Sequence, residues 1–393
     1  MGKQYISTVN ASNAHRSDIF GVAITPKYTI TVSSDGYAKF WDNKQDELTK
    51  ANDIIVRSVF VDKSGIHHLA VYENRLPSST KKVTIVAFAC FNGSIYFKYF
   101  VDDDFATMQD VGFKLEQSWV PGFYVDPENK QDFFLVNKMN GATAVYLLKV
   151  TDESADDAVT IKFEKYGDLE GNSGGSFPIS LAVNQTENRK CAVGYIDGSV
   201  LLYDFQTSKL VYTFKSTDLV VSTNPKLQSS TSVPRVLAFS PGGTLLAVGR
   251  DNQAAGSITL YDVQYGENVG TLSTPAHSAN IKGNGGVVGG FAHQGWIMGL
   301  DFDESGKHLV SCGFDKCVRV WDLDTREREA TINLSVSDFD DGVDADEHHV
   351  SVASGVKFIK KGVRGGAGSD SNEGICVVSF DRGVRWYREA GGI

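Results

Sequence analysis

The sequence contains no apolar run long enough to cross a lipid bilayer and no block of lysine and arginine residues. A membrane-spanning helix needs about 20 predominantly apolar residues, so we expect no membrane association. Among 393 residues, 38 Lys and Arg stand against 48 Asp and Glu, which gives a formal net charge of −10. Proteins that bind nucleic acid use clustered basic side chains to neutralise phosphates. The acidic balance therefore argues against direct nucleic-acid binding.

Cysteine is also scarce, and its spacing does not suit disulfides or a zinc site. The five cysteines include no Cys-x-x-Cys pair and mostly lie in apolar runs, which predicts buried thiols in a reducing compartment. The N-terminal MGKQYISTVN has neither an apolar signal segment nor the Ser or Thr at position six of a myristoylation signal. We therefore expect a cytoplasmic protein that could also be nuclear. The cysteines are Cys90, Cys191, Cys312, Cys317 and Cys376.

Amphipathic helical periodicity is nearly absent, whereas short β-branched and aromatic segments are frequent. Examples are VTIVAFACF, TAVYLLKV and VRVWD, each bounded by turn residues. Hydrophobic residues make up 41% of the chain, which is enough for a sizeable core, and 39 glycines against 9 prolines suggest many tight turns. The sequence thus predicts an all-β fold.

One phrase recurs along the chain: a strand, a turn with Asp-Gly or Asn-Gly, and a second strand that ends in an aromatic residue and often Asp. The clearest copies are SSDGYAKFWD and CGFDKCVRVWD. Seven such units divide 393 residues into about 56 each, somewhat above the usual ~40–45 of a WD repeat. We therefore predict a single seven-bladed WD-repeat β-propeller over residues 1–393. The aromatic anchors are Trp41, Phe97, Tyr146, Tyr203, Tyr261, Trp321 and Tyr387.

Each blade alone is a small sheet with exposed edges, so the ring has to close. Residues 3–9 are the one segment left to supply an outer strand for the last blade. The predicted blades are residues 10–55, 56–110, 111–165, 166–220, 221–280, 281–335, and 336–393 together with 3–9.

Two units carry the residues of the WD-repeat hydrogen-bonding tetrad. A buried indole, an imidazole and a turn carboxylate need mutual partners, so such a chain of bonds can hold the strands of one blade together. Because these residues recur by blade, we interpret them as structural rather than catalytic. The predicted tetrads are His15, Ser33, Asp35 and Trp41, and His293, Ser311, Asp315 and Trp321.

Other motifs that suggest chemistry match their patterns poorly. Ser173 in GNSGG lacks a following helix, and the glycines of 282–290 open no helix either. The pairs His67–His68 and His348–His349 have no third ligand at metal-site spacing. Residues 338–347 are rich in acid but miss the calcium-loop pattern. We therefore predict no catalytic, cofactor-binding or metal-binding residues.

The rim of the central channel carries the strongest functional signal. In a propeller, the residue before each turn Asp and the start of each inner strand project toward the same rim. The large apolar or charged residues at these positions predict a partner-binding surface, because Trp, Phe and Arg dominate binding energy at interfaces. These residues are Asp18, Phe20, Phe91, Trp119, Met139, Phe177, Arg235, Arg250, Trp296, Met298, Phe314 and Phe380, with Ser34, Ile196 and Val233 at the remaining positions.

Several longer segments resemble one family of propellers more closely than the WD dipeptide alone does. The chain is similar end to end to the WD-repeat subunit of the fungal superkiller (Ski) complex, most strongly over 233–393. That resemblance implies a non-enzymatic scaffold. The segments are NAHRSDIF, SSDGYAKFWDN, SGIHH, SITLYDVQYGENVGTLSTPAHS, FAHQGWIMGLDF and VRWYREAGGI.

The resemblance also implies partners. In that family the propeller joins a tetratricopeptide-repeat subunit and a DExH RNA helicase, and the complex feeds mRNA to the cytoplasmic exosome for 3′-to-5′ decay. In some fungi the propeller also binds the topoisomerase-like protein that makes meiotic double-strand breaks. Partner segments contain Gln-Arg and a following hydrophobic residue, so Asp18 would receive the Arg, and Trp119, Trp296 and Phe314 the hydrophobic side chain.

Two other kinds of function remain open from the residues alone. The same rim could serve another WD-repeat adaptor, such as a ubiquitin-ligase receptor or a G-protein-β-like scaffold. An enzyme would instead be a propeller hydrolase that uses channel carboxylates or Ser173. Clustered acids in the channel or labelling of Ser173 by a fluorophosphonate would favour the enzyme.

Overall fold

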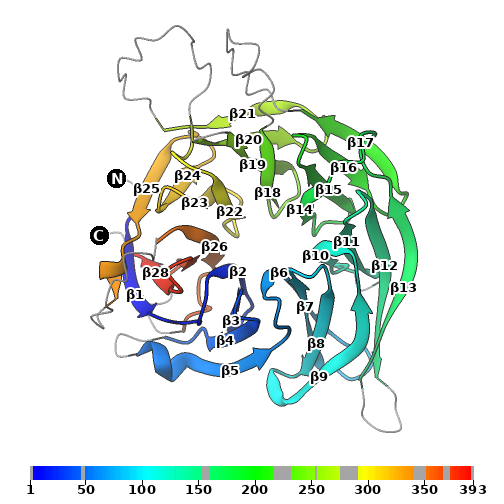
Figure 1. The fold of residues 1–393 in the computed structure, drawn as a ribbon, viewed down its shortest axis with the longest axis horizontal. Coiled ribbons are helices and arrows are strands. Elements are labelled where there is room, and N and C mark those ends of the chain that lie inside the picture. Colours follow the sequence, from blue (N-terminus) through cyan, green and yellow to red (C-terminus); the bar gives the residue numbers. More distant parts are fainter. Residues whose placement is uncertain are drawn as a thin grey trace, which may run out of the picture.

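The fold is a ring of seven four-stranded antiparallel sheets, which confirms the predicted all-β, seven-bladed propeller (Figure 1). A computed structural model describes residues 3–45, 49–128, 130–152, 159–215, 232–252, 255–274, 291–339, 351–365 and 372–390. Within these ranges the helical segments are the 3₁₀ turns η1 (Ala51–Ile54) and η2 (Val336–Asp338). None of the described helices has the length and apolar character that a membrane span requires.

The strands follow one another in the same order in every blade, from the inside of the ring to the outside. Blade 1 has β2 (Ile19–Ile24), β3 (Tyr28–Ser33), β4 (Tyr37–Asp42) and β5 (Ile55–Phe60). Blade 2 has β6 (Ile66–Arg75), β7 (Lys82–Cys90), β8 (Ile95–Val101) and β9 (Asp104–Leu115). Blade 3 has β10 (Ser118–Tyr124), β11 (Asp132–Lys138), β12 (Thr143–Asp152) and β13 (Val159–Leu169).

The remaining blades repeat this order. Blade 4 has β14 (Pro178–Val183), β15 (Lys190–Tyr195), β16 (Val200–Asp204) and β17 (Lys209–Phe214). Blade 5 has β18 (Val233–Phe239), β19 (Leu245–Asn252), β20 (Ala255–Asp262) and β21 (Asn268–Leu272). Blade 6 has β22 (Ile297–Phe302), β23 (His308–Gly313), β24 (Cys317–Asp322) and β25 (Arg328–Asn333), and blade 7 has β26 (Ala353–Ile359), β27 (Gly374–Ser379) and β28 (Val384–Glu389).

Strand β1 (Tyr5–Ala11) closes the ring as the outer strand of blade 7. It pairs antiparallel with β28, from Tyr5 opposite Glu389 to Ala11 opposite Val384. Figure 1 shows β1 beside β28, where the first and last parts of the chain meet. The predicted closure by the N-terminal strand is therefore confirmed.

Apolar side chains from neighbouring blades interdigitate between the sheets. Trp41 of blade 1 and Trp386 of blade 7 meet at 5.5 Å between ring centroids, in a core cluster that also includes Val9 of β1. All five cysteines are free thiols; four are buried, as predicted, and Cys317 is half-buried. The core thus lies between blades, which is why no single blade could retain it alone.

The tetrad of blade 6 forms as predicted, as a single directional chain of hydrogen bonds. The indole of Trp321 donates to Ser311 Oγ at 2.9 Å, and Ser311 Oγ lies 2.7 Å from His293 Nε2. His293 Nδ1 lies 2.8 Å from the Asp315 carboxylate. If the proton of His293 is on Nδ1, Trp321, Ser311 and His293 each donate one hydrogen bond to the next member of the chain. These buried polar groups therefore satisfy one another.

In blade 1 the predicted hydroxyl was wrong. Trp41 donates to Thr31 Oγ1 at 3.0 Å, and Thr31 Oγ1 lies 2.8 Å from His15 Nε2. His15 Nδ1 in turn contacts Asp35 at 3.1 Å. Ser33 instead donates to the carbonyl of Ser17 at 3.1 Å. Thr31 lies ten residues before Trp41, as Ser311 lies ten before Trp321, so this spacing identifies the correct hydroxyl.

Candidate functional site

A backbone hydrogen bond recurs at the same place in six blades and defines one rim of the ring. It joins the residue after the second strand of the blade to the residue just before the inner strand begins. In blade 6, for example, Phe314 N–H donates to the carbonyl of Trp296 at 2.9 Å. The pairs are Ser34 and Asp18, Phe91 and Gly65, Met139 and Gln117, Ile196 and Phe177, Phe314 and Trp296, and Phe380 and Val352. The two predicted sets of rim residues thus lie side by side.

Each inner strand also has an irregularity in its register near its start, at the second residue in six strands and at the third in β18; in β10 it spans Trp119 and Val120. In β2 the pairing passes from Ile19 opposite Ser33 to Gly21 opposite Val32, so Phe20 is an extra residue. Such a β-bulge re-aims the side chain that it carries. The seven residues at this position are Phe20, His67, Trp119, Ile179, Arg235, Met298 and Ser354.

Aromatic rings from three of these positions and from the rim pairs form one continuous chain of contacts, to which Arg235 adds its guanidinium. We call this set the rim belt. Its successive ring centroids lie between 3.9 and 6.2 Å apart, and Arg235 stacks over Trp296 at 5.0 Å from the ring centroid at one end. Aromatic pairs at such separations stabilise one another beyond the area they bury. In order, the rim belt is Phe177, Trp119, His67, Phe91, Phe20, Phe380, Phe314, Trp296 and Arg235.

The rim belt and the neighbouring rim residues Asp18, Met139 and Ile196 combine close packing with exposure. Phe91, Met139, Ile196, Trp296 and Phe314 are each between 38% and 45% exposed, although they are large and apolar. Asp18, Phe20, Trp119, Phe177, Arg235 and Phe380 are half-buried beside them. Met298 differs, because it packs against the core between blades 6 and 7. An exposed apolar cluster with a few charges is typical of a protein-binding surface.

Arg250 was placed wrongly at the rim by the sequence pattern. It is fully buried and donates from Nη1 to the carbonyl of Gly198 at 2.6 Å and to that of Ser232 at 3.2 Å. In the ladder of blade 5, Arg250 lies opposite Pro234 and Asp251 lies opposite Val233, so Asp251 occupies the rim position. Asp251 accepts a short hydrogen bond from Arg235 Nε. A shift of one residue exchanges the two faces of a strand, which explains the error.

His67 is the rim residue that the sequence did not reveal. Its ring stacks on Trp119 at 3.9 Å and contacts Phe91 at 5.1 Å between centroids. Nε2 lies 3.2 Å from the carbonyl of Cys90, and Nδ1 lies 2.6 Å from Nδ1 of His68. If His67 donates from Nε2 and His68 donates from Nδ1, both rings are neutral and both short contacts are satisfied. The pair is thus part of the rim.

This pair predicts that acid weakens the fold. Burial and then the like charge of His68 lower the pKa of His67 from 6.5 to about 2. Below pH 6.5 the unfolded state therefore binds a proton that the folded state does not, and the free energy of unfolding falls as the pH falls. One pKa unit corresponds to about 1.4 kcal/mol, so His67 contributes a loss of about 2 kcal/mol between pH 6.5 and 5. Urea unfolding at pH 7 and pH 5 measures this loss, and His67→Gln should reduce it; an equal loss in the variant would contradict the assignment.

Of the other candidates for chemistry, the structure describes Ser173. Ser173 is exposed in the loop between β13 and β14 that leads to Phe177 of the rim belt, and its motif is followed by a strand rather than a helix. The glycine-rich segment 282–290, the pair His348–His349 and most of the acidic loop 338–347 lie outside the described residues.

Comparisons with known proteins agree with the propeller. The family model "WD domain, G-beta repeat" matches residues 286–322. The chain is 33% identical to "Antiviral protein SKI8" of Saccharomyces cerevisiae over 412 aligned positions, which cover 100% of both chains. It is 24% identical to "Meiotic recombination protein rec14" of Schizosaccharomyces pombe over 68% of this chain and 74% of that one. A "Striatin homolog" of Dictyostelium discoideum is 26% identical over 50% of this chain and 22% of the relative.

Proposed function

The chain belongs to the SKI8 family of WD-repeat propellers, and on that premise we propose that it is a non-catalytic scaffold that docks short segments of a tetratricopeptide-repeat subunit. The family and the propeller support a scaffold role in general. The finer proposal is that the complex it assembles contains a DExH RNA helicase and feeds mRNA to the exosome for 3′-to-5′ decay. The proposal places the chain in the cytoplasm, where that decay occurs.

The observation that carries the proposal is the continuity of the rim belt. Its members come from all seven blades, so an extended segment could contact several blades at once. The aromatic side chains are held by one another before any partner arrives. A preorganised surface loses little conformational entropy on binding, so more of the contact energy remains as affinity.

The polar groups of the rim suit a segment that carries both a charge and an apolar side chain. Asp18 is half-buried, with its carbonyl accepting from Ser34 N–H at 3.0 Å, so the backbone that bears its carboxylate is fixed. A carboxylate of this kind can accept an arginine of the partner. Trp119, Trp296 and Phe314 offer the apolar surface for the hydrophobic residue that follows. Several such contacts on one rigid ring raise the effective concentration of the subunits within a complex.

The tetrads support a structural rather than a catalytic role for the most enzyme-like residues. His293 and Asp315 are occupied by Ser311 and Arg319 and hold strands of blade 6 together. His15 and Asp35 are occupied in the same way in blade 1. The acidic chain would leave contact with RNA to the helicase, because its charge disfavours phosphate binding.

Trp296→Ala and Asp18→Ala are the variants that test the proposal. Each is expected to weaken capture of the tetratricopeptide-repeat subunit by about 30-fold or more, since truncation of an interface anchor costs about 2 kcal/mol or more. Purified wild-type and variant propellers are compared by pull-down of that subunit and by fluorescence anisotropy with its Gln-Arg segment as a synthetic peptide. Thermal unfolding should change little, because Trp296 is 41% exposed.

Tyr265→Ala is the matched control. Tyr265 is an aromatic residue that is 65% exposed, but it lies in the turn between β20 and β21 rather than in the rim belt. Its removal should leave capture unchanged. If both rim variants capture the subunit as well as the wild type does, the rim is not its docking surface.

A second role rests on a separate observation. The similarity to a relative named for meiotic recombination suggests that the same rim also binds a topoisomerase-like break-forming protein, which would require a nuclear pool of the propeller. The two roles would then compete for one surface. A two-hybrid or co-precipitation assay with the break-forming protein, in wild type and in Trp296→Ala, tests this; binding that survives the variant would separate the two surfaces.

A further inference from the structure

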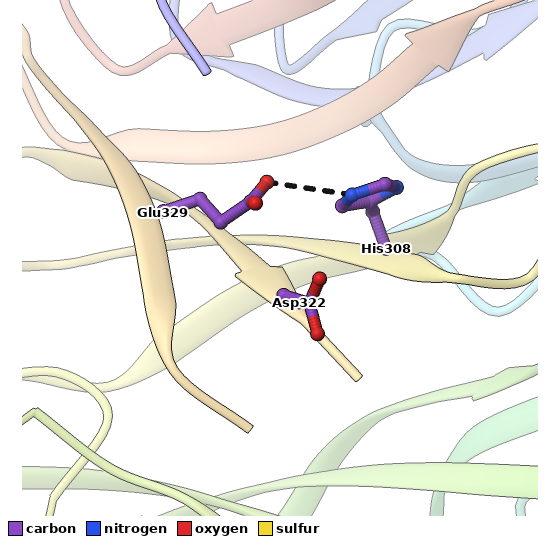
Figure 2. A group of neighbouring side chains, drawn as sticks. All are labelled: His308, Asp322 and Glu329. Atoms are coloured by element: carbon purple, nitrogen blue, oxygen red, sulfur yellow. Dashed lines mark ion pairs between the residues drawn. The ribbon is translucent and has the colours of Figure 1, made fainter. Parts of the chain in front are cut away.

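A cluster of potential metal ligands lies on the outer strands of blade 6, away from the rim belt. His308 of β23, Asp322 of β24 and Glu329 of β25 each offer one ligand atom, and Figure 2 shows them as neighbours, with His308 and Glu329 facing each other. These atoms all lie within 4.8 Å of one another, and among the described residues this is the one group of its kind. The spacings in sequence match no metal-binding motif, so the sequence alone gave no sign of the cluster.

The sheet itself positions the three side chains. His308 and Asp322 are direct partners in the ladder between β23 and β24. Between β24 and β25, Val320 lies opposite Ala330 and Trp321 opposite Arg328, so Glu329 is an extra residue in a β-bulge. Because a bulge re-aims its side chain, Glu329 points back over the neighbouring strands. Three adjacent strands thereby contribute one ligand each.

A buried carboxylate fixes the orientation of the histidine. Asp303 is only 4% exposed, and its Oδ1 accepts from the backbone N–H of His308 at 2.9 Å. Its Oδ2 lies 3.1 Å from His308 Nδ1, so the ring can donate from Nδ1 and leave the lone pair of Nε2 directed toward the cluster. Histidines that bind metals almost always donate their other ring nitrogen to a carboxylate or carbonyl in this way.

The separation of two of the three groups suits a shared ion. His308 Nε2 and Glu329 Oε2 lie 3.3 Å apart, yet Glu329 Oε2 is inaccessible to solvent and makes no hydrogen bond. Zinc lies about 2.0–2.2 Å from nitrogen and carboxylate ligands, and tetrahedral geometry then separates two ligands by about 3.4 Å. The separation of these two atoms is close to that value, and the ligand atom of Asp322 lies within 4.8 Å of both.

Several carboxylates lie near the cluster. The pKa of the Tyr5 hydroxyl is raised above its usual value by burial and by the carboxylates of Glu389, Glu373, Glu329 and Asp303. Lys3 pairs with Glu373 and Glu389 at 3.5 Å, whereas Asp303 and Glu329 have no lysine or arginine partner among the described ion pairs. A divalent cation would offset this accumulation of negative charge.

The geometry points to a structural divalent-metal site in blade 6, formed by His308, Asp322 and Glu329, that prefers zinc among the common cations. One imidazole and two carboxylates with a water in the fourth position form a tetrahedral N/O set, which favours zinc over magnesium. The ion would tie β23, β24 and β25 together at the outer edge of the blade. Without an ion, Glu329 would pair with His308 directly, which is the outcome that the test distinguishes.

The test is zinc titration of the full-length protein after treatment with a chelator and removal of any histidine tag. Isothermal titration calorimetry is expected to show one zinc per chain and no comparable binding of Mg²⁺. His308→Gln and Glu329→Gln, which keep the size of the side chains, should each weaken zinc binding about tenfold or more, and Asp303→Asn should also weaken it by loss of ring orientation. The absorption spectrum of the Co²⁺-substituted protein should show tetrahedral coordination that the variants lose.

Glu327→Gln is the matched control, because Glu327 is an exposed carboxylate two residues from Glu329 that lies outside the cluster. It should bind zinc as the wild type does. Circular dichroism confirms that each variant is folded. The absence of stoichiometric zinc binding, or zinc binding that His308→Gln and Glu329→Gln both retain, would overturn the proposal and leave the cluster as an ion pair.

Discussion

Removal of residues 1–11 is expected to abolish the stable folded ring, because this segment contains the outer strand of blade 7. Val9 is buried in β1, and full burial of a valine contributes roughly 1.5–3 kcal/mol. The ladder to β28 adds several hydrogen bonds of roughly 0.5–1.5 kcal/mol each. Together these terms approach the roughly 5–15 kcal/mol by which native proteins are stable. Soluble yield and a cooperative transition in thermal unfolding measure the result.

Two point variants in β1 separate the effect of closure from that of a shortened chain. Val9→Asp places a carboxylate in the core beside Trp386 and should cost several kcal/mol, because a buried unpaired charge is strongly unfavourable. Ile6→Asp changes a residue that is 46% exposed in the same strand and should alter stability by about 0.5 kcal/mol or less. Cooperative unfolding of the truncated chain near the temperature of the intact chain would show that the ring closes without β1.

Closure could be predicted from the sequence because the number of strands in each repeat can be counted. Six repeats each contain enough chain for four strands, but the last repeat ends after β28 with three. A sheet with an uncovered edge beside blade 1 has to obtain its outer strand from elsewhere. The N-terminal segment precedes the first complete blade, so it was the one available donor. The count of blades followed from the same repeats, since each carries one aromatic anchor and one turn.

The register within a blade could not be predicted as securely. In blade 1 the hydroxyl nearest the turn was chosen, and the tetrad uses Thr31, two residues earlier on the same face of β3. In blade 5 the sequence RDNQAAG places Asp251 where five of the other blades have an apolar rim residue, and the pattern therefore favours Arg250. Side chains alternate between faces with a period of two, and a miscount of one residue exchanges a rim position for a buried one.

The role of His67 was hidden for a different reason. The side chain reaches the rim because β6 has an extra residue between Ile66 and His68. Such a bulge cannot be recognised from the alternation of polar and apolar residues in the sequence. Once one bulge is known, its position can be transferred, because every inner strand has a register shift near its start. A comparison of the seven repeats at that position would have grouped His67 with Phe20 and Trp119.

Replacement of Asp315 by alanine is expected to cost about 3–5 kcal/mol, because breaking a buried ion pair from one side leaves the other charge uncompensated. The carboxylate accepts from Arg319 Nη1 at 2.7 Å and lies 2.8 Å from His293 Nδ1, and both of these partners are buried. It also accepts from the backbone N–H of Gln294 at 3.1 Å. Urea unfolding at pH 7 measures the loss, and Asp315→Asn should cost less since an amide keeps one acceptor for Arg319.

The corresponding variant in blade 1 should cost less than Asp315→Ala. Among the described residues, Asp35 forms its ion pair with His15, and Lys39 stands two residues before Trp41 where blade 6 has Arg319 before Trp321. Asp35→Ala therefore removes hydrogen bonds without stranding a buried guanidinium, and we expect a cost of about 1–3 kcal/mol. Asp324→Ala, at an exposed position after Trp321, should stay within about 0.5 kcal/mol. The ion pair between Arg319 and Asp315 is the difference between the two blades. Equal costs for Asp315→Ala and Asp35→Ala would therefore show that this ion pair does not contribute to stability.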